Sequence, residues 1–191
     1  MLTEQIAVTL AVVDALDALG VPYAIGGSFA SALHGVMRAT MDADLVADLR
    51  LEHVEPLVQA LDDAFYADAE MMRDAIRRQG SFNLIHLGTM FKVDVFVAKL
   101  RAFDRSQLAR RQLHLLSEDP ERHAYVISAE DVVLSKLEWY RMGGEVSDCQ
   151  WRDVLGVLEV QGDRLDQDYL RRMSVELGVT DLLERVLEEA G

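Results

Sequence analysis

Apolar residues recur at helical spacing at the start of the chain and then change to the shorter period of strands. Residues 3–19 carry an apolar side chain at every third or fourth position, which predicts a helix ending at Gly20. The run VPYAIGG follows, and its two glycines predict a short strand that enters a tight corner. Ser28 is a candidate N-cap for a helix that reaches about His34 and stops at Gly35.

The middle of the chain mixes both periods. Residues 42–49, with the sequence DADLVADL, alternate with period two and predict a strand, whereas 51–62 and 68–78 have helical spacing. Residues 81–97 contain two β runs joined at Gly88-Thr89, which predicts a hairpin or a tight meander. A further short strand is expected at 125–127.

The last third of the chain has helical periodicity only. Ser128 and Asp131 form an N-capping pattern before a long helix, and three further helices are predicted near 148–160, 166–177 and 179–189. We therefore predict an α+β protein with a mixed β-sheet core flanked by helices in residues 1–127, followed by a C-terminal helical region in residues 128–191.

Composition limits the class of protein. Half of the 191 residues are apolar, which is enough for a sizeable core. No apolar stretch approaches the roughly 20 residues needed to span a membrane, so no membrane partner is expected. Cys149 is the only cysteine, which excludes an intrachain disulfide and fits a cytoplasmic setting.

The net charge is -14, so the overall field of the protein does not favour nucleic acid. Residues 92–111 are an exception, because they hold six Lys and Arg residues against two Asp residues. This stretch is either a local surface for a polyanion or a solvated face of mixed charge.

Three aspartates interrupt segments that otherwise have the character of buried strands. Asp42 and Asp44 would project to the same side of one strand, roughly 7 Å apart at Cα. Asp94 lies between two valines in the later strand FKVDVFV. Carboxylates at this spacing repel each other, and a divalent cation that keeps several waters, such as Mg²⁺, relieves the repulsion. Three acids on adjacent strands can hold two metal ions that clamp a phosphate.

The corner Gly26-Gly27-Ser28 supplies a complementary feature. Glycines allow the backbone to approach a ligand, the amides at a helix N-terminus suit a phosphate, and Ser28 adds a hydroxyl. The corner alone is a weak signal. Followed by Asp42-x-Asp44 and a third aspartate in a later strand, it is a much stronger one.

These motifs resemble the nucleotidyltransferase superfamily, which has the fold of DNA polymerase β. The motifs GGS-x(13)-D-x-D and VDVF carry the resemblance. Within the superfamily, the stretch HGVMRATMDADL is similar to small bacterial nucleotidyltransferases of the abortive-infection toxin type. The likeness continues through SAEDVVLSKLEWYRMGG and SDCQWRDVLGVLEV, where it implies that Lys136 and Asp153 complete the nucleotide site.

The resemblance also implies a role for each motif. Mg²⁺ on Asp42 and Asp44 would hold a nucleoside triphosphate, and Asp94 would assist a second metal ion and deprotonate or orient the acceptor hydroxyl. The corner Gly26-Gly27-Ser28 would hold the β and γ phosphates, while Lys136 and Arg38 would neutralise phosphate charge.

Structural alternatives stand beside these roles. Lys136 could be an ordinary exposed lysine, Asp153 could pair with Arg152 or Arg141, and Arg38 could be a structural partner of the aspartates.

Three functions follow from this pattern. The first is nucleotidyl transfer to a macromolecule, either tRNA or a protein, with an antitoxin as a possible partner. The second is modification of a small molecule such as an antibiotic, where an acidic cleft would suit a cationic aminoglycoside. The third is a nucleotide-binding regulatory module with reduced catalysis.

Overall fold

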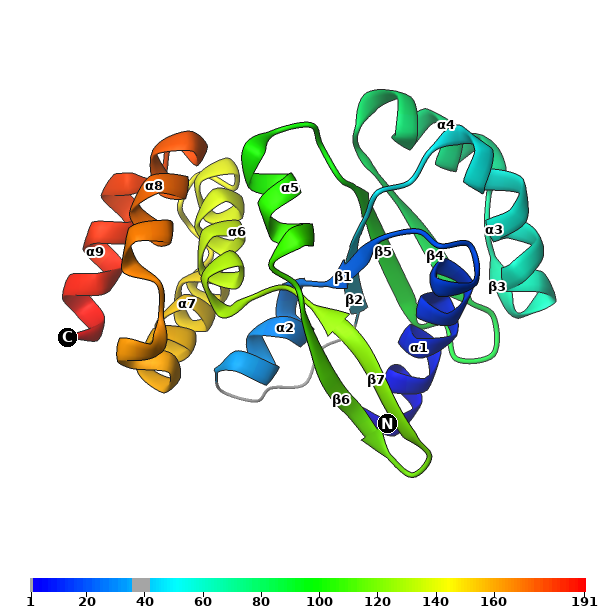
Figure 1. The fold of residues 1–191 in the computed structure, drawn as a ribbon, viewed down its shortest axis with the longest axis horizontal. Helices are drawn as coiled ribbons and strands as arrows, with labels where there is room; N and C mark the ends of the chain where they lie inside the picture. The colour runs from blue at the N-terminus through cyan, green and yellow to red at the C-terminus, as the bar shows by residue number, and fades with distance from the viewer. Residues whose placement is uncertain (1, 36–41) are drawn as a thin grey trace. The chain divides into compact units, whose positions relative to one another are not determined.

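The computed structural model describes residues 2–35 and 42–191 of the chain, which form two compact units (Figure 1). The first unit comprises described residues 2–25 and 42–126, and the second comprises 26–35 and 127–191. The division of the chain into domains at residue 127 stays a prediction.

A mixed sheet with the strand order β3-β4-β5-β2-β1-β7-β6 forms the centre of the first unit. Its strands are β1 (Tyr23–Ile25), β2 (Asp42–Ala47), β3 (Phe65–Tyr66), β4 (Ser81–His86), β5 (Lys92–Val97), β6 (Gln112–Glu118) and β7 (Glu121–Val126). The pairs β1–β7 and β2–β5 are parallel, and the other neighbours are antiparallel. The α+β prediction is therefore confirmed, as is the β4–β5 hairpin.

The helices of the first unit are α1 (Leu2–Ala18), α3 (Val54–Leu61), α4 (Ala69–Arg78) and α5 (Ala102–Ala109), with short 3₁₀ turns at Leu51–His53 and Asp62–Ala64. Helix α1 packs on α3 and β2, and α4 packs on α3 and β4. Buried alternate residues of three neighbouring strands supply one apolar face of the sheet: Ala43, Leu45, Ala47, Phe82, Leu84, Val93, Val95 and Val97. Because successive residues of a strand point to opposite sides, the residues between these apolar ones project from the other face of the sheet.

The second unit consists of helices. They are α2 (Gly27–His34), α6 (Ala129–Met142), α7 (Asp148–Gln161), α8 (Gln167–Leu177) and α9 (Thr180–Ala190), with a 3₁₀ turn at Gly162–Arg164. The predicted cap of α6 is confirmed, because the Ser128 Oγ accepts the Asp131 N–H at 3.2 Å and donates to the Asp131 carboxylate at 2.9 Å. The Tyr169 hydroxyl donates to the same carboxylate at 2.7 Å and so ties α8 to the start of α6.

Two sequence predictions need correction, and three elements were not predicted. Ser28 is not the N-cap of α2, because the helix begins at Gly27 and Gly26 occupies the cap position. Gly27 has a φ of 57°, a left-handed value that glycine adopts without strain. Strand β7 begins at Glu121, earlier than expected, and β3, β6 and α5 were not predicted.

Candidate active site

Strand β2 places two carboxylates on the face of the sheet that is opposite to the apolar one. Ala43 and Leu45 are fully buried, while Asp42 and Asp44, at the alternate positions, are partly exposed. The prediction that Asp42 and Asp44 share a face is confirmed. Burial of the apolar residues fixes which face of the strand points to the core. The alternation of side chains then places both carboxylates on the opposite face.

The parallel neighbour β5 brings two further charged side chains to the same face. In the register of the two strands, Asp44 is opposite Asp94 and Asp42 is opposite Lys92. Residues directly opposite each other on neighbouring strands project to the same side of a sheet. Three acids and one lysine therefore form a charged patch, which we call the carboxylate cluster: Asp42, Asp44, Asp94 and Lys92.

Lys92 joins two of these carboxylates. Its Nζ lies 2.6 Å from Asp94 Oδ2 and 4.0 Å from Asp42 Oδ2. The hydrogen bond to Asp94, together with the charges of the three aspartates, raises the pKa of the lysine against the opposing effect of partial desolvation. Lys92 is therefore an ammonium ion at neutral pH, and it cancels part of the negative charge.

Asp94 is more enclosed than Asp42 or Lys92. Its side chain is 17% exposed, against 41% for both Asp42 and Lys92. Asn83, from the antiparallel neighbour β4, donates from Nδ2 to Asp94 Oδ1 at 3.4 Å. Each oxygen of this carboxylate thus faces a donor, which fixes its orientation.

The donor set of the cluster fits Mg²⁺, although its side chains do not form a closed cage. Among the residues described, no group of three or more His, Cys, Asp or Glu side chains is arranged to hold a metal ion. Mg²⁺ does not need such a group, because it usually binds one or two carboxylates and completes its shell with water and substrate phosphates. Asp42 and Asp44 supply two such carboxylates on one strand.

The Gly-Gly-Ser corner opens helix α2 in the second unit. Gly26 has an extended backbone and no side chain with which to cap the helix. Ser28 lies in the first turn, and the Ser31 Oγ donates to the Gly27 carbonyl at 2.9 Å. The corner therefore has the predicted backbone form, a strand followed directly by a helix N-terminus.

Lys136 and Asp153, from α6 and α7, are brought together as an ion pair. The Lys136 Nζ lies 2.7 Å from Asp153 Oδ2, and their side chains are only 6% and 8% exposed. The lysine also donates to Gln150 Oε1 at 3.2 Å. The alternative of an exposed Lys136 is therefore wrong. Asp153 therefore pairs with a lysine of the neighbouring helix.

The remaining predicted residue, Arg38, lies outside the described residues. The sequence analysis did not assign Lys92 or Asn83 to the site. Lys92 is two positions before Asp94 in the same strand. Because residues i and i+2 of a strand point to the same side, the sequence could have predicted that Lys92 shares the face of that aspartate. Asn83 had no such local signal, because its position depends on the pairing of β4 with β5.

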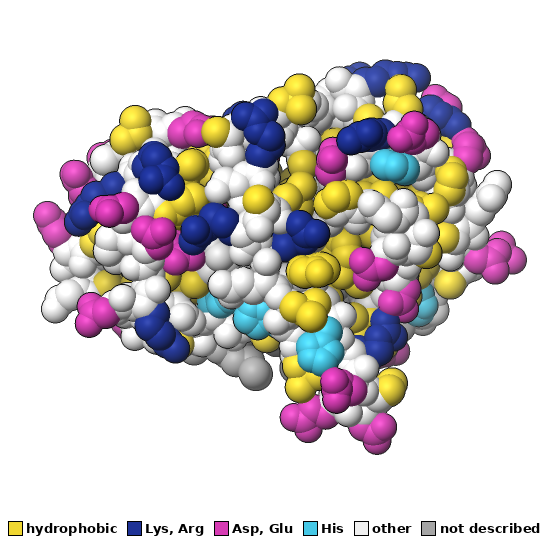
Figure 2. All heavy atoms as spheres, in the orientation of Figure 1, with side chains coloured by type: hydrophobic (Ala, Val, Ile, Leu, Met, Phe, Trp, Pro, Cys, Tyr) yellow, Lys and Arg dark blue, Asp and Glu magenta, His cyan; other side chains and the backbone are white. Residues whose placement is uncertain are grey.

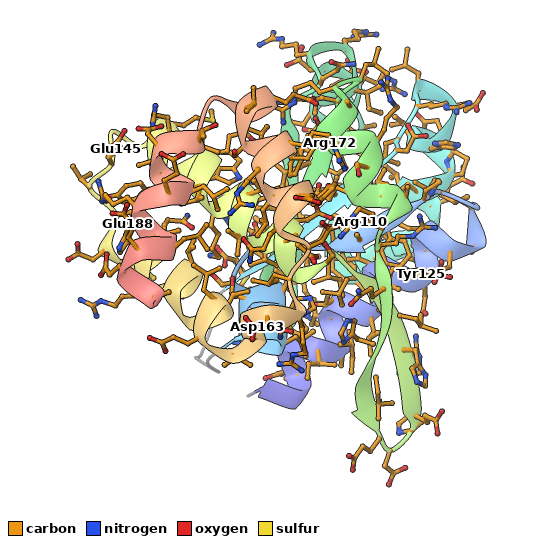
Figure 3. All side chains as sticks on the ribbon, turned by 60° about the vertical axis from the view of Figure 1, so that its left-hand side comes forward. Arg110, Tyr125, Glu145, Asp163, Arg172 and Glu188 are labelled. Atoms are coloured by element: carbon orange, nitrogen blue, oxygen red, sulfur yellow. The ribbon has the colours of Figure 1, made fainter. Side chains whose placement is uncertain are left out.

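Several cations of the basic stretch 92–111 have partners within the chain. The Arg101 Nε lies 2.6 Å from Asp104 Oδ2, and Arg105 donates to the Leu100 carbonyl at 2.7 Å. Figure 3 shows Arg110 where α5 ends and Tyr125 on β7, and the Arg111 guanidinium lies 4.5 Å from the centre of the Tyr125 ring. On the face shown in Figure 2, Lys and Arg side chains are scattered among Asp and Glu.

No protein-family model and no curated protein sequence matches the chain. Solved structures do match it. The solution structure of the antibiotic-resistance factor ANT(2'')-Ia aligns with a TM-score of 0.60 and 15% identity, over 99% of this chain and 100% of that one. Its crystal structure in complex with adenylyl-2''-tobramycin gives 0.53 and 14%, over 89% and 96%.

A second protein has a similar structure. An antigenic nucleotidyltransferase-like protein from Paracoccidioides brasiliensis aligns with a TM-score of 0.56 and 18% identity, over 97% of this chain and 93% of that one. These similarities show that the chain has a nucleotidyltransferase-like fold. No helix in the described ranges has the length and apolar character needed to cross a membrane.

Proposed function

We propose that the protein is a Mg²⁺-dependent nucleotidyltransferase that moves a nucleoside monophosphate from a nucleoside triphosphate to an acceptor hydroxyl. The observation that supports this most is the register of β2 and β5, which puts Asp44 opposite Asp94 on the face that also carries Asp42. A nucleotidyltransferase-like fold supports the same reaction class by analogy.

In this proposal Asp42 and Asp44 hold the metal ion. When bound, the ion would neutralise charge on the triphosphate and on the departing pyrophosphate. Asp94, oriented by Asn83, accepts the proton of the acceptor hydroxyl. The acceptor oxygen forms a bond to the α-phosphorus. The bond from that phosphorus to the bridging oxygen breaks, and pyrophosphate leaves with the electron pair.

Six further residues are proposed for nucleotide binding on the basis of the sequence resemblance. They are Gly26, Gly27, Ser28, Arg38, Lys136 and Asp153. Of these, the buried pair Lys136–Asp153 has a specific physical argument, because a lysine held at one position by a carboxylate and an amide is pre-organised. Pre-organised charge stabilises a transition state without reorganisation during the reaction.

Charge favours a small cationic acceptor over RNA. The net charge of -14 attracts cations and repels polyanions. Lys92 and Arg101, two cations of the stretch that could have faced RNA, are engaged with Asp94 and Asp104. A structure of the similar ANT(2'')-Ia holds adenylyl-2''-tobramycin. An aminoglycoside-type hydroxyl is thus the first acceptor to test. Acceptors on tRNA or protein, and an antitoxin partner, stay predictions of the sequence.

The test is incubation of the protein with each α-³²P-labelled nucleoside triphosphate, Mg²⁺ and a panel of acceptors that includes tobramycin, total tRNA and cell lysate. We expect label on an acceptor hydroxyl, and a fall in its rate of about a thousandfold in Asp44→Asn, because several kcal/mol of charge stabilisation are lost. Asp94→Asn should slow transfer by about 10² to 10⁴ because it removes the general base.

Asp48→Asn is the matched control. Asp48 follows β2, its side chain is 46% exposed, and its described ion pair with Arg50 is long at 3.8 Å. This variant loses one carboxylate just after the same strand and should keep its transfer rate. Equal losses in Asp44→Asn and Asp48→Asn would contradict the proposal, as would transfer that persists in Asp44→Asn.

A further inference from the structure

Lys92 is the one member of the carboxylate cluster that the reaction above does not require as a ligand or a base. It lies on the same strand face as Asp94 and opposite Asp42 in the parallel register. Its ammonium contacts Asp94 Oδ2 at 2.6 Å and lies 4.0 Å from Asp42 Oδ2. The lysine therefore reaches both strands from a position between the carboxylates.

We propose that Lys92 is a built-in counter-ion, which neutralises the carboxylate cluster when no divalent cation is bound and which a divalent cation must displace in order to bind. This inference rests on the proposed function, because it takes Asp42 and Asp44 as the cation ligands.

The geometry supports the first half of the proposal. Three carboxylates on two hydrogen-bonded strands repel each other, and a cation between them removes much of that repulsion. Lys92 is tethered next to the aspartates by the strand itself, so its local concentration does not depend on the solution. Its side chain is 41% exposed, which leaves the ammonium a route away from the cluster into water.

The geometry supports the second half as well. The ammonium lies 4.0 Å from Asp42 Oδ2, so a cation bound to that oxygen at a metal–oxygen distance of about 2.1 Å would lie close to it. Two cations so close to each other repel. Binding of the divalent cation is therefore coupled to release of Lys92 from Asp94 and Asp42, and the lysine weakens cation affinity.

The test is the dissociation constant of Mn²⁺ as a probe for Mg²⁺, measured by calorimetry on the full chain without nucleotide. Lys92→Met keeps most of the aliphatic side chain and removes the charge, so it should bind Mn²⁺ about tenfold more tightly than the unmodified protein. Lys92→Arg keeps the charge and should bind more weakly than Lys92→Met. Lys99→Met is the control, because Lys99 is exposed and its loss changes the net charge equally.

A second measurement addresses the metal-free state. In EDTA, Lys92→Met should have a melting temperature lower by about 2 °C, and Mn²⁺ should raise it more than it raises that of the unmodified protein. Lys99→Met should have the same melting temperature in EDTA as the unmodified protein, and Mn²⁺ should raise it by the same amount. An Asp44→Asn variant that loses Mn²⁺ binding shows that the carboxylate cluster is the site that is being measured.

The outcomes separate the inference from the proposed function. Suppose that Asp44→Asn abolishes Mn²⁺ binding but Lys92→Met leaves it unchanged or weakens it. This result overturns the inference and leaves the proposed function intact. Absence of Mn²⁺ binding in both the unmodified protein and Lys92→Met overturns the inference. The proposed function is then decided by the transfer assay alone, because substrate phosphates can complete the metal site. A tenfold gain shared by Lys99→Met overturns the inference as well, because it assigns the gain to net charge.

Discussion

Lys136 and Asp153 form an ion pair that is almost entirely removed from water. Burying two charges costs several kcal/mol for each ion, and their attraction offsets this cost only when the geometry is good. Here the contact of 2.7 Å and the further bond to Gln150 provide that geometry. Removing one partner leaves the other charge buried and unpaired, so the pair is sensitive to single substitutions.

Lys136→Met should therefore lower the free energy of unfolding by about 3 kcal/mol, as measured by urea denaturation. The double variant Lys136→Met/Asp153→Leu should recover much of this loss, because no charge is then left without a partner. A single variant as stable as the unmodified protein would show that the pair is not buried in solution.

Tyr23 provides a pH-dependent prediction at the same scale. Burial, and then the charge of Asp17, raise the pKa of its hydroxyl well above the ordinary value. The neutral form is thus favoured in the folded state. Stability from this residue is complete below the unfolded pKa of about 10 and is lost as the pH rises above it, by up to about 1.4 kcal/mol per pH unit.

Urea unfolding of Tyr23→Phe at about pH 9, 10 and 11 checks this, because those values span the unfolded pKa. The unmodified protein should lose stability more steeply than the variant across this range. Equal slopes would mean that Tyr23 does not contribute to the alkaline loss of stability.

Local alternation was enough to predict that Asp42 and Asp44 share a face, because residues i and i+2 of a strand always do. It was not enough to pair Asp44 with Asp94, since the register of β2 and β5 depends on contacts far apart in the sequence. Ser28 was predicted wrongly as the N-cap, because the helix begins at Gly27, which has a left-handed φ that a sequence pattern does not reveal.

At the scale of elements, α2 and α7 approach each other unusually closely. A Cβ added to Gly35, at the end of α2, would lie 2.9 Å from two backbone atoms of α7, the Gly156 carbonyl carbon and the Val157 nitrogen. Backbone atoms cannot move aside as the end of a side chain can. The buried His34 beside it fixes the same helix end through an Nε2 contact of 2.8 Å to the Ile127 carbonyl.

Gly35→Ala should therefore destabilise the protein by about 2 kcal/mol through overpacking, as measured by urea unfolding. Gly80→Ala is the matched control, since a Cβ at Gly80 meets no atom within 4 Å. Equal stability of the two variants would contradict the close approach of α2 and α7.

Long periodic elements were predictable, whereas short or edge elements were not. Helices α1 and α6 to α9 have sustained apolar periods and clear caps or stops. Strand β6 lies at the edge of the sheet and exposes Leu113 and Leu115, so its pattern does not distinguish a buried face. It is a strand because β7 pairs with it, which is a tertiary effect.

At the scale of the whole molecule, the net charge of -14 predicts how an acceptor binds. A polycationic aminoglycoside should bind more weakly as salt screens the field, with a dissociation constant that rises about tenfold between roughly 50 and 300 mM NaCl. Calorimetry at the two concentrations checks this. Affinity that does not change with salt would show that the net charge plays no part in acceptor binding.

The grouping of α2 with the C-terminal helices is a property of the whole chain. His34 and Ile127 are 93 positions apart, and no local pattern links them. Composition and net charge, in contrast, can be read directly from the sequence. They favour a cationic class of acceptor but do not identify the compound.

Nucleotidyl transfer can be distinguished from other reactions of a nucleoside triphosphate by following α-³²P and γ-³²P label in parallel reactions with Mg²⁺ and an acceptor. We expect α-label to appear on the acceptor in step with the release of γ-label as pyrophosphate, and we expect both to stop in Asp44→Asn but to continue in Asp48→Asn. Transfer of γ-label to the acceptor, or release of inorganic phosphate alone, would contradict nucleotidyl transfer.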